Sequence, residues 1–332
     1  GRDMRGNSVP SDTLVCRLFI YNKKAPATWV AAGPGDPSGT VTVERTTAGL
    51  AVVTHDDGSL LRYRIGGSTS APAPERIMSF DDILGGQKLT GFARGEGNRV
   101  YLGTQAGIAC ALVRREEAYI DPSFGEVGYA RMERFRGRRL GSPEYANGIV
   151  YVGVGGTEYT APGLALIDSG EGLVRGFVDL GGYFGNDPEP PAVTAAPDGV
   201  WCAHPSTGMI IRMTPYGAIM WTGDSSSWVI GADSDGRSLI YGIGVDADGF
   251  SYFNTPGTSA RCVVVGPDGY ALFRVILVSL PGLRVSDVVP VIEERPTDGL
   301  YFVTRGGDIP YVFHVPFTVR TGIIVDEANY ME

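Results

Sequence analysis

One local pattern recurs six times along this chain of 332 residues, at a period of about 50 residues. Each copy has a turn that ends in glycine or asparagine, followed by a run of aromatic and β-branched residues typical of a β-strand. The turns end, in chain order, at Gly49, Asn98, Gly148, Gly199, Gly249 and Gly299. Because the spacing varies only between 49 and 51 residues, we interpret the copies as one supersecondary unit repeated along the chain.

Each copy is consistent with four antiparallel strands. Type I′ hairpin turns are predicted at four dipeptides, because both central residues of that turn need positive φ: Asn147–Gly148, Asp198–Gly199, Asp248–Gly249 and Asp298–Gly299. The run before each turn is the expected inner strand, and these runs cover residues 41–47, 88–94, 140–146, 191–197, 241–247 and 290–296. A second strand, a loop with glycine or proline, and third and fourth strands are expected to follow.

A sheet built from these apolar runs cannot bury both of its faces alone. Packing the sheets radially in a ring covers both faces and leaves only short edges. No run of 10–15 residues has a convincing helical period, which argues against alternating strands and helices. We therefore predict an all-β fold, a six-bladed β-propeller that occupies residues 1–332 as a single domain.

The N-terminus leaves an alternative open. Residues 13–31 predict a hairpin similar to the third and fourth strands of a repeat. We expect this hairpin to take part in ring closure beside residues 310–325. The alternative is a seven-bladed ring in which the hairpin forms a reduced blade.

Charge and composition restrict the class of partner. The net charge of −9 argues against nucleic acid, whose binding depends on cationic side chains. No stretch approaches the 18 apolar residues of a transmembrane helix. The four cysteines lie far apart in apolar runs, without a C-x-x-C pair, and are expected to be core residues: Cys16, Cys110, Cys202 and Cys262.

Two repeats carry a family resemblance. Residues 198–221 (DGVWCAHPSTGMIIRMTPYGAIMW) and 248–275 resemble the blades of NHL-type and gluconolactonase-type (SMP-30) propellers, in which Asp-Gly opens an aromatic strand. The resemblance covers roughly residues 40–325 and concerns architecture, which does not determine function.

Gluconolactonase-type enzymes hold a cation on the propeller axis through acidic and asparagine side chains. The resemblance therefore makes Glu44, Glu144 and Asp246, in or beside expected inner strands, weak candidates for Ca²⁺ ligands. Their order and positions do not match the family pattern, so its catalytic residues cannot be transferred. Carboxylates lining a wet channel are the favoured interpretation, and no cofactor is predicted.

Loops between second and third strands are expected to share one face around the channel. If a ligand binds there, its candidate contacts are His55, Asp56, Asp57, Gln105, Glu158, Tyr159, His204, Asn254, Arg305 and Asp308. Joint metal ligation by His55 and His204 is disfavoured, because they lie three repeats apart. Residues 131–139 carry five arginines, interpreted as alternating charge on an outer strand, with a patch for an acidic partner as the alternative.

These features favour a non-catalytic propeller that binds a protein or acts as a scaffold in a larger assembly. One alternative is a divalent-metal-dependent hydrolase or lactonase of the gluconolactonase type. Another is a binder of small ligands or carbohydrates that uses aromatic residues such as Tyr159, Tyr183 and Trp228. We expect an extracytoplasmic location, periplasmic or secreted, although four cysteines without a pairing motif argue the other way.

Overall fold

The structure is a computed structural model, and the residues that it describes are almost all strands and their connections. It describes residues 14–21, 28–31, 42–46, 49–56, 59–64, 75–114, 117–204, 206–224, 242–245, 251–255, 259–265, 271–279, 287–291, 300–305, 311–315 and 317–324. Side chains are described for residues 59–60, 78–114, 117–204 and 206–223.

The first half of the chain forms three antiparallel sheets, each a meander of consecutive strands. The first sheet contains β3 (Thr42–Thr46), β4 (Gly49–Asp56), β5 (Ser59–Arg64) and β6 (Glu75–Ser79). The second contains β7 (Leu89–Arg94), β8 (Arg99–Thr104), β9 (Gly107–Arg114) and β10 (Glu117–Ile120), with β11 (Tyr129–Arg131) also paired with β9. The third contains β12 (Leu140–Ala146), β13 (Ile149–Val154), β14 (Gly163–Asp168) and β15 (Val174–Asp179).

Three further sheets follow, and the last one includes a strand from the start of the chain. The fourth sheet contains β16 (Ala192–Ala196), β17 (Gly199–Ala203), β18 (Met209–Met213) and β19 (Ile219–Asp224). The fifth contains β20 (Gly242–Val245), β21 (Ser251–Thr255), β22 (Ser259–Val265) and β23 (Ala271–Ser279). The sixth contains β24 (Asp287–Val291), β25 (Leu300–Arg305), β26 (Tyr311–Val315) and β2 (Thr28–Ala31).

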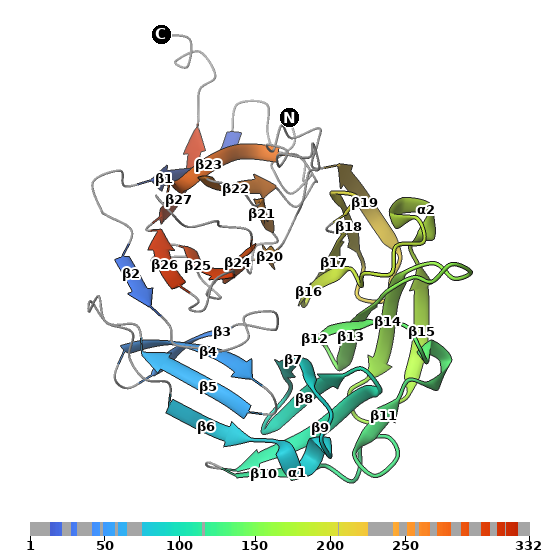
Figure 1. The fold of residues 1–332 in the computed structure, drawn as a ribbon. Coiled ribbons are helices and arrows are strands. Elements are labelled where there is room, and N and C mark those ends of the chain that lie inside the picture. Colours follow the sequence, from blue (N-terminus) through green and yellow to red (C-terminus); the bar gives the residue numbers. More distant parts are fainter. Residues whose placement is uncertain are drawn as a thin grey trace.

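The sheets follow one another around a ring, with the first strand of each sheet toward the centre (Figure 1). β12 contacts the inner strands β7 and β16 on either side of it, and β20 contacts β16 and β24. The chain is therefore an all-β propeller, as predicted. Six four-stranded meanders are present among the described strands, whereas the number of blades in the ring stays a prediction.

Most of the expected inner strands lie where the repeat predicts them. β3, β7, β12, β16 and β20 fall within the predicted runs, and β12 matches residues 140–146 in full. The sixth prediction is displaced, because β24 covers Asp287–Val291 whereas residues 290–296 were expected. The evenly spaced turn lies directly before the second strand of each repeat, and the position of the first strand before it is predicted less accurately.

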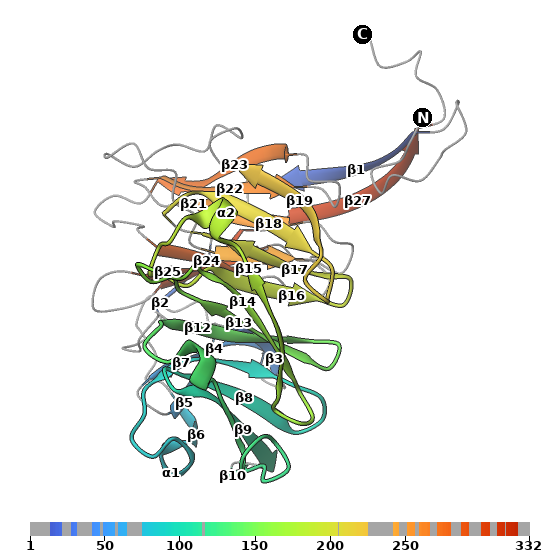
Figure 2. The same cartoon turned by 90° about the vertical axis from the view of Figure 1, so that its right-hand side faces the viewer.

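The N-terminal segment does not form the expected hairpin. β1 (Leu14–Tyr21) pairs with β27 (Phe317–Ile324) in a two-stranded ribbon near the chain ends (Figure 2), whereas β2 pairs with β26 in the sixth sheet. β1 and β2 thus belong to different sheets, because each finds its partner in the C-terminal part of the chain. β2 supplies the fourth strand that completes the last meander.

The two Asp/Asn-Gly turns that the structure describes differ. Asn147 and Gly148 have φ of 49° and 76°, and the pair Ala146–Ile149 closes a two-residue loop, so the predicted type I′ turn is confirmed. At Asp198–Gly199 the type I′ prediction is wrong, because Ala196 pairs with Gly199 and the turn is centred one residue earlier. Proline at position 197 holds φ near −65°, which excludes a type I′ turn there. The turns at 248–249 and 298–299 lie outside the described residues.

Apolar clusters fill the spaces between neighbouring sheets. Between the second and third sheets, Tyr101, Phe124, Phe135 and Val152 are buried together. Cys110 and Cys202 are fully buried free thiols, which confirms the prediction of core cysteines at these two positions. The side chains of Cys16 and Cys262 lie outside the described part. No helix among the described residues is long and apolar enough to cross a membrane.

Candidate functional site

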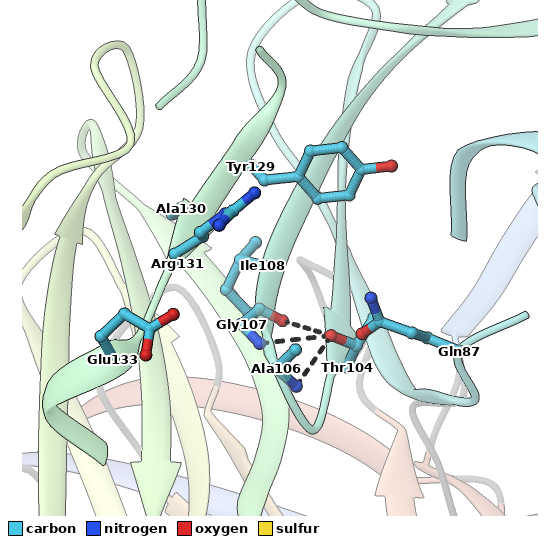
Figure 3. Close-up of a pocket in the computed structure, with 9 residues that line it drawn as sticks. All are labelled: Gln87, Thr104, Ala106, Gly107, Ile108, Tyr129, Ala130, Arg131 and Glu133. Atoms are coloured by element: carbon cyan, nitrogen blue, oxygen red, sulfur yellow. Dashed lines mark hydrogen bonds between the residues drawn. The ribbon is translucent and has the colours of Figure 1, made fainter. Parts of the chain in front are cut away.

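The turn between β8 and β9 is held rigid by one buried hydroxyl group. Thr104 Oγ1 accepts hydrogen bonds from the backbone N–H groups of Ala106 and Gly107, both at 3.2 Å, and donates to the carbonyl oxygen of Gly107 at 3.0 Å (Figure 3). A side chain at Gly107 would collide with the backbone of β11, because its Cβ would lie 2.3 Å from the Ala130 oxygen. The turn therefore presents fixed backbone atoms beside β11.

The connection between β10 and β12 folds back over this turn. It contains β11 and a 3₁₀ helix, η1 (Glu133–Phe135), before it enters the inner strand of the third sheet. Arg131, at the end of β11, pairs with Gly107 at the start of β9. On the other side, Gln87 and Lys88 link helix α1 (Asp81–Leu84) to β7. Three segments of the second sheet and its connections therefore converge on one face.

Two adjoining pockets lie between these segments. One has a volume of about 270 Å³ and is lined by Gln87, Thr104, Ala106, Gly107, Ile108, Tyr129, Ala130, Arg131 and Glu133 (Figure 3). The other has a volume of about 700 Å³ and is lined by Gln87, Lys88, Gln105, Ala106, Met132, Glu133, Arg136 and Gly137. Because they share Gln87, Ala106 and Glu133, we call them together the groove.

Charged side chains surround the groove. Arg131 forms an exposed ion pair with Glu126, with Nε 3.2 Å from Oε2. The guanidinium group of Arg136 is exposed and has no partner among the described residues. The carboxylate of Glu133 is also exposed and has no described partner. The groove therefore offers at least one uncompensated cation and one uncompensated anion to a ligand.

Two other arginines attach this connection to the third sheet. The rings of Phe135 and Phe177 lie 5.0 Å apart, and the guanidinium groups of Arg134 and Arg138 contact both rings. Arg138 Nε also donates a hydrogen bond of 2.7 Å to the Gly155 oxygen, and its Nη2 donates to the Ala161 oxygen. The expectation of alternating charge on an outer strand is therefore wrong, because residues 131–139 are mainly a connection anchored by stacking.

The predicted loop-face residues come from strands and connections of different sheets. Gln105 borders the groove, but its amide bonds to the backbone N–H and oxygen of Leu140 at 3.1 and 3.2 Å. Glu158 and Tyr159 are exposed in the next loop, and Tyr159 is 86 % exposed. The backbones of His55 and Asp56 lie in β4, that of Asn254 in β21 and that of Arg305 in β25, whereas Asp57 and Asp308 lie outside the described residues. A binding role for these residues stays a prediction.

His204 is buried rather than open to a ligand. Its side chain has no exposed surface, and its ring centroid lies 4.8 Å from that of Phe184 in α2 (Gly181–Phe184). Neither ring nitrogen has a hydrogen-bond partner of normal geometry among the described residues, although the backbone of Glu189 is near. Burial lowers the pKa of His204, while the carboxylates of Asp187 and Glu189 act in the opposite direction. A neutral, enclosed imidazole is therefore a packing group in this structure.

Among the three predicted cation ligands, Glu144 is the one whose side chain the structure describes. It lies in the inner strand β12, opposite Tyr151, and no described residue pairs with its carboxylate. Burial raises its pKa to about 8. Glu44 lies in β3, Asp246 lies outside the described residues, and within the described part no three His, Cys, Asp or Glu side chains are placed to share a metal ion.

Sequence reasoning missed half of the groove. The segment 131–139 and Gln105 were identified, but their meeting with Gln87 and Lys88 carried no signal, because nothing in the repeat predicts that the connection between β10 and β12 folds back. That connection is longer than the others, since nineteen residues separate Ile120 from Leu140. This length is the feature that could have identified it.

Comparison with known proteins shows the fold alone. No family model and no curated protein matches the chain. Among solved structures, a member of the DUF4221 family from Bacteroides vulgatus has a TM-score of 0.53 at 10% identity, over 92% of this chain and 99% of that one. The aldose sugar dehydrogenase of Streptomyces coelicolor, solved with PQQ, has a TM-score of 0.51 at 12% identity, over 92% and 99%. A calcium-binding protein, regucalcin, from Agrobacterium tumefaciens has 0.51 at 12%, over 89% and 92%. The expected gluconolactonase-type likeness is thus shared by several kinds of propeller, and the NHL likeness stays a prediction.

Proposed function

We propose that this propeller is a non-catalytic module that binds a segment of a partner protein in the groove. The observation that carries the proposal is the pair of adjoining pockets between the rigid β8–β9 turn and the connection 131–137. A rigid ring that displays loops at one face is well suited to recognition, because the loops can vary while the scaffold stays fixed. The groove walls need little reordering on binding, which lowers the entropic cost of association.

The rigidity of both walls supports this proposal. On one side, Thr104 fixes three backbone atoms of the turn. On the other side, Arg138 and the Phe135–Phe177 pair fix the connection to the third sheet. A functional group placed on such walls keeps its position when a ligand arrives.

A photo-crosslinking experiment tests the proposal. Arg136, at the groove, is replaced by a photoreactive phenylalanine analogue, and the matched control carries the analogue at Arg114, which is exposed at the opposite end of β9. After irradiation in extracts of the source cells, we expect one discrete adduct from position 136 that is absent from position 114. Equal labelling at the two positions, or no discrete adduct at 136, would contradict the proposal.

A metal-dependent hydrolase is the second candidate, and Glu144 is the observation that favours it. A carboxylate on an inner strand, without a partner in the part of the chain that the structure describes, is the type of group from which an axial Ca²⁺ site is built. Isothermal titration with Ca²⁺ distinguishes the candidates: a site that is lost in Glu144→Gln supports the hydrolase, whereas unchanged binding in that variant argues against it. The third candidate, a carbohydrate binder, would use exposed rings such as Tyr159, and glycan binding that is lost in Tyr159→Ala would support it.

The extracytoplasmic location expected from the sequence is also part of this proposal. Fractionation of the source cells, followed by detection of the protein in each fraction, tests it. Recovery of the protein with cytoplasmic markers would contradict it.

A further inference from the structure

We infer that the groove binds an extended acidic segment, rich in Asp and Glu, of the partner protein. This inference rests on the proposed function and specifies the chemistry of the partner. The charges along the groove, the way its arginines are held and its apolar lining support it.

The segment that contributes Arg131, Glu133 and Arg136 to the groove differs in charge from the whole chain. The whole chain has a net charge of −9, yet residues 131–139 contain five arginines and a single glutamate. Lys88 also lines the larger pocket. Exposed charges act over about 8–10 Å at physiological ionic strength, so a ligand in the groove experiences this local set more than the distant acidic surface.

The arginines of this segment have different roles. Arg138 is committed to two carbonyl oxygens, and Arg139 pairs with Glu189. Arg131 is paired with Glu126 at the surface, where such a pair is easily exchanged for a ligand. Arg136 has no described partner and borders the larger pocket. An arginine displays five donors in a fork that fits a carboxylate, so Arg136 is the first expected contact.

Part of the lining of the groove is apolar. Ile108, Ala130 and Met132 line the two pockets and are almost completely buried. The walls rise on either side as the β8–β9 turn and η1 (Figure 3). This arrangement favours an extended chain that lies along the groove, with its carboxylates directed at Arg136.

Glu133 should have the opposite effect to Arg136 on the affinity for an acidic segment. Its carboxylate borders both pockets and has no described partner. It should repel an acidic segment, whereas it would attract a basic one. Two neighbouring residues, Glu133 and Arg136, therefore predict opposite effects on the same ligand.

The experiment measures the binding of three rhodamine-labelled probes by fluorescence anisotropy. The probes are a decapeptide of alternating Glu and Ala, the same peptide with Gln for Glu, and a ten-nucleotide single-stranded DNA. We expect the Glu peptide to bind more tightly than the Gln peptide, and its binding to weaken from 50 to 500 mM NaCl. Tighter binding of the DNA than of the Glu peptide would overturn the inference, because the site would then recognise polyphosphate.

Four proteins are compared with the Glu peptide. Arg136→Ala should weaken binding about two- to five-fold, Glu133→Gln should tighten it by a similar factor, and Arg114→Ala at the far end of β9 should leave it unchanged relative to the unmodified protein. All three residues are exposed, so the variants should fold, and their circular dichroism spectra and melting curves are recorded as a check. Equal effects of Arg136→Ala and Arg114→Ala, or effects of the same sign for Arg136→Ala and Glu133→Gln, would overturn the inference.

The two proposals fail in different ways. If crosslinking at position 136 captures a partner but the Glu and Gln peptides bind equally, the groove is a binding site and the acidic specificity is wrong. If position 136 yields no specific adduct and the Glu peptide does not bind, both proposals are wrong.

Discussion

A methyl group added at Gly153 tests how closely the third and fourth sheets are packed. Gly153 is buried in β13, and a Cβ atom at this position would lie 2.2 Å from the carbonyl oxygen of Pro191 and 3.2 Å from its carbon. Carbon–oxygen contacts shorter than about 3 Å are strongly repulsive, so the backbone that leads into β16 would have to move by about 1 Å. Pro191 resists this movement because its ring fixes φ.

We expect Gly153→Ala to destabilise the protein by about 1–2 kcal/mol. Overpacking of a filled interior costs about 1–3 kcal/mol, and the lower entropy of an unfolded chain with alanine returns about 0.5–1 kcal/mol of this. The matched control is Gly176→Ala in β15, where no atom lies within 4 Å of the new Cβ and φ is not positive. There we expect no loss, or a gain of up to about 1 kcal/mol.

Urea denaturation followed by intrinsic fluorescence measures both variants against the unmodified protein. The midpoint of Gly153→Ala should fall, and that of Gly176→Ala should stay or rise. If Gly153→Ala were as stable as Gly176→Ala, the sheets would not touch at Pro191, and the reasoning from close radial packing would be refuted.

Three further predictions concern single side chains. Burial raises the pKa of Glu144 to about 8, so the folded state binds this proton more tightly than the unfolded state. The free energy of unfolding should therefore fall as pH rises from about 5 to 8. Glu144→Gln should flatten this dependence on pH, and an equal slope in the variant and the unmodified protein would contradict the prediction. Because burial lowers the pKa of His204, the stability of the protein should fall as pH drops below about 6.5. His204→Phe should lose less stability than the unmodified protein between pH 7 and pH 5. Thermal melts of both proteins at these two pH values test the prediction. Asn147 has φ of 49°, so Asn147→Ala should cost about 1–2 kcal/mol in urea denaturation, whereas Asn98→Ala, where φ is not positive, should cost less; equal losses would refute the assigned turn.

The sequence predicted the repeat unit well, because each unit is specified by local features. Continuous apolar runs place β13 and β17, and an Asn-Gly turn places the hairpin that joins β12 to β13. These signals act within about ten residues. The packing between sheets keeps the strands and turns that these local signals specify.

The errors lie where a distant partner decides the structure. β1 and β2 have the pattern of a hairpin, yet they do not pair with each other; each pairs with a strand within residues 310–325, beside which they are expected to lie. The turn at Asp198 is displaced by its neighbouring proline, which removes the conformation that Asp-Gly alone would adopt.

The candidate site was the least predictable part. The groove depends on how the connection after β10 folds back onto β9, and no local pattern encodes that path. His204 was expected at an open loop end, but the chain that follows α2 encloses it, because Phe184 and the backbone near Glu189 pack against its ring. The arginine segment was noticed for its charge, while the aromatic stacking that orders it required Phe177 from the third sheet.

The N-terminal strand β2 pairs with β26 and completes the last sheet of the propeller. In this register Val30 lies opposite Val312, and Val303 lies opposite Val312 on the other side, so Val30 and Val303 are two strands apart. Opposed residues in neighbouring antiparallel strands are about 4.5–5.5 Å apart at Cα, within reach of a disulfide, whereas residues two strands apart are separated by about 10 Å, beyond it. Two double variants, Val30→Cys/Val312→Cys and Val30→Cys/Val303→Cys, are oxidised mildly in the folded state, and linked peptides are identified by mass spectrometry. The first variant should form the 30–312 disulfide. The second should form none. No 30–312 disulfide, or equal linkage in the two variants, would contradict the account.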